Sequence, residues 1–255
     1  MNRASKSGSS RSTYTSESGV VLLSVRSSHD ADVRRASGCN ITVHGIGATD
    51  RELDPGEHLT WVSVAQFEQV LDAVSGRSDV RITFDDGNAS DVKVALPRLV
   101  ERGITAEFFL LAGELGKLGR VDDTGVRELL DAGMSIGSHG WAHRDWRRID
   151  DAQAHEEFED AHERLSAVTG SSVSRVAIPF GSYDRHVLRR LRDAGVTRVY
   201  TSDGGRARPE AWLQARTSLR HDIDADWIYR LLDPHTPLVL SARNSAARAV
   251  KRWRG

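Results

Sequence analysis

Cysteine is almost absent from this sequence of 255 residues, in which Cys39 is the only one. A single cysteine excludes an intramolecular disulfide and a cysteine-rich zinc site, so any metal ligands must be His, Asp or Glu. No run of about 18 apolar residues occurs, so we expect no transmembrane helix. Neither sign of charge is in excess, because 35 Lys and Arg face 36 Asp and Glu. This balance gives no electrostatic reason to expect a nucleic acid or an anionic membrane as partner.

The two ends of the chain differ in character from its middle. Residues 1–38 begin with a Ser-rich stretch, which predicts a largely disordered segment. The apolar run Val20–Val25 is too short for the core of a signal peptide, so we expect a cytoplasmic location unless the start is mis-assigned or export uses an unrecognised route. Residues 243–255 form a basic tail. Residues 39–242 are predicted to form one domain.

Short β-rich runs alternate with helical runs along this domain. The predicted strands are 40–44, 79–84, 105–111, 134–137, 175–178 and 197–201, with weaker candidates at 212–217 and 237–240. The predicted helices are 63–74, 90–103, 123–133, 151–168, 184–194 and 225–232. Ser63 and Gln66 form a capping box, Pro97 predicts a kink, and Gly195 is an expected C-cap. The alternation favours parallel strands with crossover helices, in a barrel or a doubly wound sheet.

Polar clusters directly follow four of the predicted strands. They are His44, Asp85-Asp86-Gly87, Ser138–His143 and Pro179–Asp184. The carboxyl ends of parallel strands open on one face, and ligands bind at that face. We therefore expect these four clusters to contribute to one site.

The adjacent carboxylates of Asp85 and Asp86 are the first candidate for chemistry. Two neighbouring carboxylates repel each other, so one of them usually needs a cation or a proton. A metal ion bound by one Asp, with the other left free as a base, meets this need. The alternative is a β-turn in which Gly87 supplies a positive φ angle, although a solvated turn needs only one Asp.

His139 and His143 are the second candidate. A spacing of four residues on one helical turn points both imidazoles the same way, as in metal-binding pairs. With Asp86 they form a set of two His and one carboxylate that leaves positions open for water and substrate. We expect one divalent metal ion, with zinc first and cobalt, nickel or iron as alternatives. Ordinary surface or core histidines remain the alternative reading.

Two further features lie beside these residues. The segment Pro179-Phe180-Gly181 is suited to presenting backbone N–H groups to a developing oxyanion, although Pro-x-Gly is also a common loop. Trp141 is a candidate for stacking on a sugar ring, although a Trp near a loop more often serves packing.

Together these motifs resemble the polysaccharide deacetylase family, which is also called the NodB homology or carbohydrate esterase family 4 group. Thr83–Gly87 matches the T-F-D-D-G motif in full, and Ser138–His143 matches S-H-x-x-x-H. The third motif, R-x-P-x-G, is matched only at Pro179 and Gly181. The resemblance covers about residues 39–218. It implies a distorted (β/α) barrel of seven or eight mainly parallel strands.

The same resemblance implies a metal-dependent hydrolase that removes N-acetyl groups from an N-acetylglucosamine-containing glycan or glycoconjugate. It implies a metal held by Asp86, His139 and His143, a base at Asp85, and an oxyanion contact from the N–H of Phe180. The expected partner is therefore a carbohydrate substrate, and no oligomeric state is predicted. A metal amidohydrolase for a small non-sugar amide and an inactive, metal-retaining glycan-binding module are the alternatives.

Two departures from the family pattern affect the proton-transfer groups. Ala177 stands where the third motif has the Arg that orients the base, and Arg216 or Arg175 is a candidate replacement. Ala242 stands where the last motif, L-x-L-x-H, has the His that acts as general acid.

The general acid is therefore open. His44 resembles the first-strand His of the exopolysaccharide and biofilm deacetylase branch, and it is the first candidate. Asp85 acting as both base and acid is the second.

Overall fold

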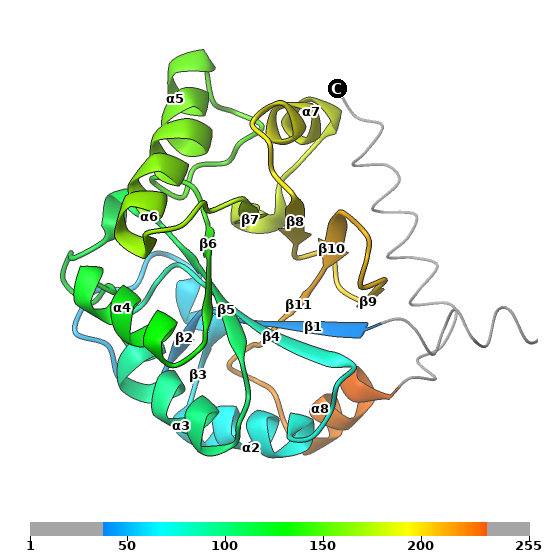
Figure 1. Cartoon of the computed structure of the whole chain (residues 1–255). Coiled ribbons are helices and arrows are strands. Elements are labelled where there is room, and N and C mark those ends of the chain that lie inside the picture. Colours follow the sequence, from blue (N-terminus) through cyan, green and yellow to red (C-terminus); the bar gives the residue numbers. More distant parts are fainter. Residues whose placement is uncertain (1–37, 234–255) are drawn as a thin grey trace, which may run out of the picture.

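The computed structural model describes residues 38–233, which Figure 1 colours by sequence. The predicted disorder of the N-terminal segment, the strand at 237–240, Ala242 and the basic tail lie outside the described residues. The domain bounds 39–242 stay a prediction.

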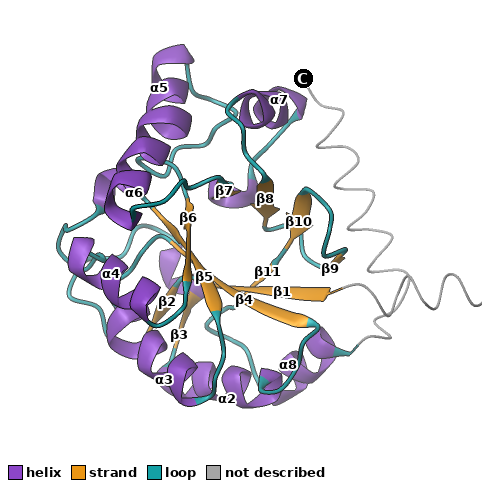
Figure 2. Cartoon of the chain, viewed as in Figure 1, coloured by secondary structure: helices purple, strands orange, loops and turns teal. Residues whose placement is uncertain are grey.

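The centre of the fold is a nearly closed, mainly parallel sheet whose strands run in the order β10-β8-β7-β6-β5-β4-β1-β11 (Figure 2). The first half comprises β1 (Gly38–Val43), β4 (Val80–Asp85), β5 (Ala106–Leu110) and β6 (Ser135–Ser138). The second half comprises β7 (Arg175–Ala177), β8 (Arg198–Thr201), β10 (Leu213–Ala215) and β11 (Thr217–Ser218). The predicted barrel of seven or eight mainly parallel strands is confirmed.

Three short strands complete the set. The two-residue strand β9 (Arg206–Ala207) pairs with β1 in the antiparallel sense. The strands β2 (Gly45–Ile46) and β3 (Trp61–Val62) pair with each other in parallel. None of these three was predicted, because two residues carry too little pattern to identify a strand.

The barrel closes at a single residue. The sequence predicts one strand over 212–217. Strand structure is present there, but it divides at Arg216 into β10 and β11. On one side of this residue β10 pairs with β8, and on the other side β11 pairs with β1. Arg216 therefore lies where the two ends of the sheet meet.

Helices surround the barrel on its outside (Figure 1). They are α2 (Val64–Val74), α3 (Leu96–Glu101), α4 (Asp123–Asp131), α5 (Asp151–His155), α6 (Ala161–Thr169), α7 (Arg185–Asp193) and α8 (Ala225–Leu232). The capping box of α2 is confirmed, since Gln66 N–H donates to Ser63 Oγ and the Gln66 side chain accepts from Ser63 N–H. No helix within residues 38–233 is long and apolar enough to cross a membrane.

Two of the predicted helices are interrupted by π-helical turns. A turn at Asp91–Ala95 precedes α3, and Pro97 lies in the first turn of that helix, where its missing N–H is tolerated. A second turn at Glu156–Asp160 joins α5 to α6 and buries Glu157 and Phe158. Turns of this kind occur frequently at functional sites.

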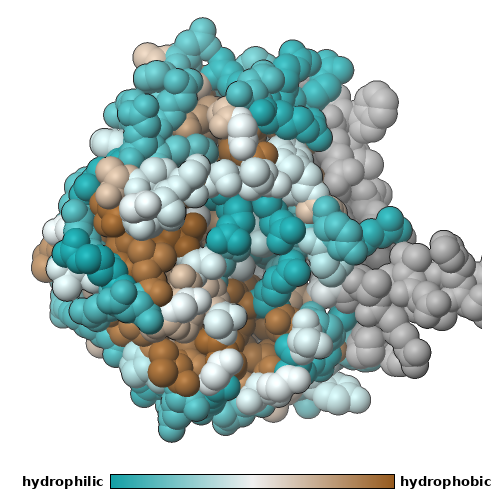
Figure 3. All heavy atoms as spheres, viewed as in Figure 1, coloured by the Kyte–Doolittle hydropathy of each residue, from teal (hydrophilic) through white to brown (hydrophobic). Residues whose placement is uncertain are grey.

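The apolar core fills the space between the sheet and the helices. Phe84 of β4 stacks on Phe108 of β5 with ring centroids 4.4 Å apart, and Phe67 of α2 meets Phe84 edge-on. The inside of the barrel is more polar, since Thr42 and Thr83 are buried there and contact each other. At the surface, hydrophilic residues cover α5 and α7, and apolar residues are visible toward the middle of the face in Figure 3.

Candidate metal centre

Asp86, His139 and His143 converge at the carboxyl end of the sheet. Their ligand atoms all lie within 4.8 Å of one another. The Nε2 atoms of His139 and His143 lie 3.4 Å and 3.6 Å from Asp86 Oδ1. Asp86 and His139 are buried and His143 is partly exposed, so the group opens to solvent on the His143 side. The three residues come from the loops after β4 and β6.

Backbone strain is concentrated at this site. Among residues 38–233, the non-glycine residues with a positive φ angle are Asp86 (74°), His143 (53°) and Phe180 (58°). Such a conformation costs on the order of 1–3 kcal/mol and persists where its surroundings fix it. All three strained residues lie in loops that follow strands at this end of the barrel.

The expected helical turn for the two histidines is wrong. Residues 139–143 form a loop in which Gly140 has φ 85°. The imidazoles meet because this loop folds back on itself, and their ring centroids are 5.1 Å apart. The spacing therefore located the pair correctly but assigned it the wrong backbone conformation.

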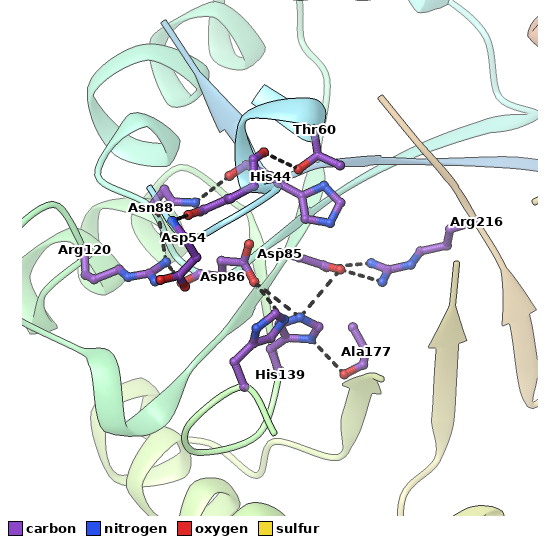
Figure 4. A network of polar contacts seen from close by, with 12 residues as sticks. His44, Asp54, Thr60, Asp85, Asp86, Asn88, Arg120, His139, Ala177 and Arg216 are labelled. Carbon is purple, nitrogen blue, oxygen red and sulfur yellow. Dashed lines mark hydrogen bonds and ion pairs between the residues drawn. The ribbon is translucent and has the colours of Figure 1, made fainter. Parts of the chain in front are cut away.

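The donor atoms of this group fit a divalent metal ion. His139 Nδ1 donates to the carbonyl oxygen of Ala177 at 2.8 Å, which leaves the Nε2 lone pair facing Asp86 (Figure 4). Asp86 Oδ1 is buried and has no hydrogen-bond donor. Two imidazole lone pairs and a carboxylate oxygen that face one point need a cation between them, and this donor set suits zinc and neighbouring transition metals.

The pKa values agree with this interpretation. Burial would raise the pKa of Asp86, but the neighbouring His139 and His143 hold it below the ordinary value. Burial lowers the pKa of His143 to about 4, so this imidazole is neutral at pH 7. Burial would also lower the pKa of His139, but the Asp85 and Asp86 carboxylates raise it. A metal ion and this proton compete for the same site.

Asp85 lies beside the three ligand residues, with Oδ2 3.9 Å from His139 Nε2, and its carboxylate is bound by Arg216. The guanidinium donates from Nη1 to Oδ1 and from Nη2 to Oδ2, each at 2.7 Å (Figure 4). Burial would raise the pKa of Asp85, but the Arg216 charge holds it below the ordinary value. Arg175, the other candidate, pairs instead with Glu107 at 2.6 Å. Arg216 therefore occupies the place beside Asp85 that the sequence left open.

The other candidate residues lie around this centre. His44 is at the end of β1, and its Nδ1 atom is buried without a hydrogen-bond partner. The Phe180 side chain is 65% exposed, with its ring 4.3 Å from that of His143. Trp141 packs against the core and against Gly113, so its sugar-stacking role stays a prediction. The roles of His44 and of the Phe180 N–H also stay predictions.

One buried carboxylate near the site was missed by the sequence analysis. Glu157, on the π-helical turn, accepts the backbone N–H groups of Trp141 and Ala142 at 2.9 Å and 3.1 Å. It also accepts Trp146 Nε1–H at 3.0 Å. Glu157 therefore fixes the loop that carries both histidines. In the sequence it lies within an acidic helical run, which gives no signal that one carboxylate points inward.

This fold and this triad define an α/β-barrel protein with a candidate metal site. The family model described as polysaccharide deacetylase matches residues 73–199, about half of the chain. The chain belongs to the polysaccharide deacetylase family.

Three similar proteins illustrate this relationship. A chitin deacetylase from Pestalotiopsis sp. is 28% identical over 127 residues, covering 49% of this chain and 42% of that protein. A peptidoglycan-N-acetylglucosamine deacetylase from Bacillus cereus is 24% identical over 134 residues, covering 51% and 47%. The Streptococcus pyogenes deacetylase PplD, solved with acetate, superposes with a TM-score of 0.69 at 18% identity, covering 78% of this chain and 99% of that one. The matches span about half the length of the curated relatives or less.

Proposed function

We propose that this protein is a metal-dependent hydrolase that removes N-acetyl groups from an N-acetylglucosamine-containing glycan or glycoconjugate. The observation that carries the proposal is that two adjacent carboxylates have different partners. Asp86 faces His139 and His143, while Asp85 is bound by Arg216. Family membership and the deacetylase relatives support a carbohydrate amide as the substrate.

Asp86, His139 and His143 would hold a divalent ion, with zinc preferred. That ion would supply Lewis-acid polarisation of the acetamide and an acidified water. Asp85 is the general base, because its lowered pKa keeps it ionised at neutral pH. Arg216 uses one lone pair of each Asp85 oxygen, and each oxygen keeps another that accepts a proton from the attacking water. The N–H of Phe180 donates to the oxyanion that forms.

His44 is our first candidate for the acid that protonates the leaving amine. Its Nδ1 atom is buried and has no hydrogen-bond partner in the described structure, and the residue as a whole is partly exposed directly after β1. In Figure 4 its ring is drawn above Asp85, and His44 is among the groups that act on the pKa of both Asp85 and Asp86. Asp85 returning the proton that it accepted is the second candidate.

The test is release of acetate from chitooligosaccharides, with and without a chelator. Asp86→Ala and His139→Ala should lose activity and metal content together. Asp85→Asn should retain the metal and lose turnover. Turnover of Asp85→Asn at the parent rate would show that the base is another group.

The same assay separates the alternatives. Acetate release from small non-sugar acetamides but not from the oligomers would indicate a small-amide hydrolase. Protein that binds both metal and oligomers but releases no acetate would be a binding module.

A further inference from the structure

The side chain of Asn88 joins three segments next to the candidate metal site. Asn88 is 1% exposed and lies two residues after Asp86. Its Nδ2 donates to the carbonyl oxygen of His44 at 2.7 Å. Its Oδ1 accepts from Arg120 Nη1 at 3.0 Å and from Arg51 Nη2 at 2.8 Å and Nε at 3.2 Å (Figure 4). Two guanidinium groups thus converge on one neutral amide oxygen.

This cluster surrounds a strained residue. Asp86 has φ 74°, and a strained backbone persists only when its neighbours fix it. Arg120 Nη1 donates to the carbonyl oxygen of Asp86 at 3.1 Å, and Val121 N–H donates to that of Gly87 at 2.9 Å. Because Asn88 holds Arg120 in place, the Asn88 amide contributes to fixing the conformation that aims the Asp86 carboxylate.

The third segment is the loop 47–60 between β2 and β3. Within it Arg51 forms a two-pronged ion pair with Glu57, and the two side chains are only 11% and 13% exposed. A largely buried ion pair in a loop is expensive unless its remaining hydrogen-bonding groups are satisfied. Asn88 supplies the acceptor for Arg51 Nε and a second acceptor for Nη2, while the carbonyl oxygen of Glu52 accepts from Nη1. The loop is therefore fastened to the turn that carries Asp86.

We propose that Asn88 is a positioning residue that couples metal binding by Asp86 to the docking of loop 47–60. The proposal rests on the metal site of the proposed function. A neutral amide suits this place, because it accepts from two arginines and donates to His44 without adding a third negative charge beside Asp85 and Asp86. The amide provides the acceptor and the donor on two separate atoms at the end of one short, uncharged side chain.

The experiment compares Zn²⁺ affinity, measured by competition with a chelating dye, and Co²⁺ absorption spectra of four proteins. They are the parent chain, Asn88→Ala, the double variant Arg51→Met/Glu57→Gln, and the control Arg98→Met/Glu68→Gln. The double variant removes the loop contact without leaving a buried charge unpaired. The control removes an ion pair of 2.8 Å between α3 and α2, away from the site. Hydrogen exchange of residues 47–60 is followed with and without Zn²⁺.

We expect Asn88→Ala and the double variant to bind Zn²⁺ about tenfold or more weakly and to shift the Co²⁺ spectrum, as is typical for residues that orient metal ligands. The control should match the parent. In the parent, Zn²⁺ should slow exchange in residues 47–60, and the double variant should lose this effect.

A folded double variant with parental Zn²⁺ affinity and exchange response would overturn the proposal, even if Asn88→Ala fails to fold. A parent protein that binds neither ion would contradict the proposed function itself. The two failures are thus distinguishable.

Discussion

The side chain of Arg216 is among the most constrained in the barrel. It is 1% exposed, lies 5.3 Å and 5.6 Å from the ring centroids of Phe109 and Tyr200, and binds both oxygens of Asp85. A planar fork packed against two aromatic rings holds the carboxylate in one orientation, which an ammonium group does not reproduce. Arg216 therefore governs both the position and the protonation of Asp85.

We predict that both Arg216→Lys and Arg216→Met lower turnover. The Met variant should lose more than the Lys variant, by about 100-fold or more relative to the parent. Asp85 must be ionised to accept a proton, so activity falls as the pH drops through its pKa. Without the Arg216 charge this pKa rises, and the acidic limb of the pH–rate profile should move to higher pH. The measurement is kcat/KM against pH. The control Arg175→Met, which disturbs the pair with Glu107, should leave that limb in place, and an unmoved limb in Arg216→Met would contradict the assignment.

At this scale the sequence predicted the residues that lie in compact motifs. Asp85 and Asp86 are adjacent, His139 and His143 are four positions apart, and each pair lies at the carboxyl end of a strand, so local spacing was enough to find each pair. Arg216 lies 131 positions from Asp85 and reaches it only because the barrel closes there. Sequence reasoning offered Arg216 and Arg175 equally, and only the strand order distinguishes them.

The π-helical turn between α5 and α6 has a direct effect on the site. It turns Glu157 inward, where one carboxylate accepts two backbone N–H groups, an indole N–H and the Arg144 guanidinium. The loop 139–146 contains a strained His143 and has no helical bonds of its own. Its shape therefore depends on a side chain from a different element.

We predict that Glu157→Gln weakens Zn²⁺ binding about tenfold and lowers the free energy of unfolding by about 2 kcal/mol. The amide of Gln would turn an NH₂ group toward backbone donors, so at least one buried N–H loses its acceptor. Dye competition and urea unfolding provide the two measurements. Glu156→Gln is the matched control, because the Glu156 side chain also pairs with Arg144 but is not the acceptor of the Trp141, Ala142 and Trp146 N–H groups. Equal effects of both variants would argue against this role for Glu157.

At the scale of elements the sequence predicted what depends on local pattern. The capping box at Ser63 was sufficient to place the start of α2, and the alternation of strands with helices was sufficient for parallel strands with crossover helices. The barrel itself was implied only by the family resemblance. The π-helical turns were not predictable, because the inserted residue shifts the apolar pattern only within a segment too short to reveal the shift. The helical turn predicted for residues 139–143 was also wrong, because a spacing of four residues fits a helical turn and a folded loop equally well.

Metal binding should stabilise the whole molecule, because the three ligand residues converge only in the folded chain. At an ion concentration 100 times Kd, the gain is about 2.7 kcal/mol. We therefore predict that Zn²⁺ raises the Tm of the parent protein, that a chelator reverses the rise, and that Asp86→Ala shows no response. A parental Tm that is independent of Zn²⁺ would contradict a site in this position.

Asp79 ties several parts of the barrel together at the opposite end of β4 from the site. Its carboxylate accepts from Arg77 at 2.9 Å and from Arg206 of β9 at 2.9 Å, and its backbone oxygen accepts Cys39 N–H of β1 at 2.8 Å. Arg77 also donates to the carbonyl oxygen of Leu232 at the end of α8. The hydrogen bonds from Arg77 and Arg206 outweigh the effect of burial and lower the pKa of Asp79 to about 2.

This lowered pKa predicts a stability difference that depends on pH. The folded state favours the ionised carboxylate, so its contribution is fully present above pH 4 and is lost as the pH falls toward 2. Because the side chain is 34% exposed, solvent screening reduces the contribution to about 1 kcal/mol. Asp79→Asn should therefore unfold at a lower urea concentration than the parent at pH 7, and the gap should close near pH 2. A gap of constant size between pH 7 and pH 2 would mean that the geometry of the Asp79 contacts, and not their charge, holds these strands together.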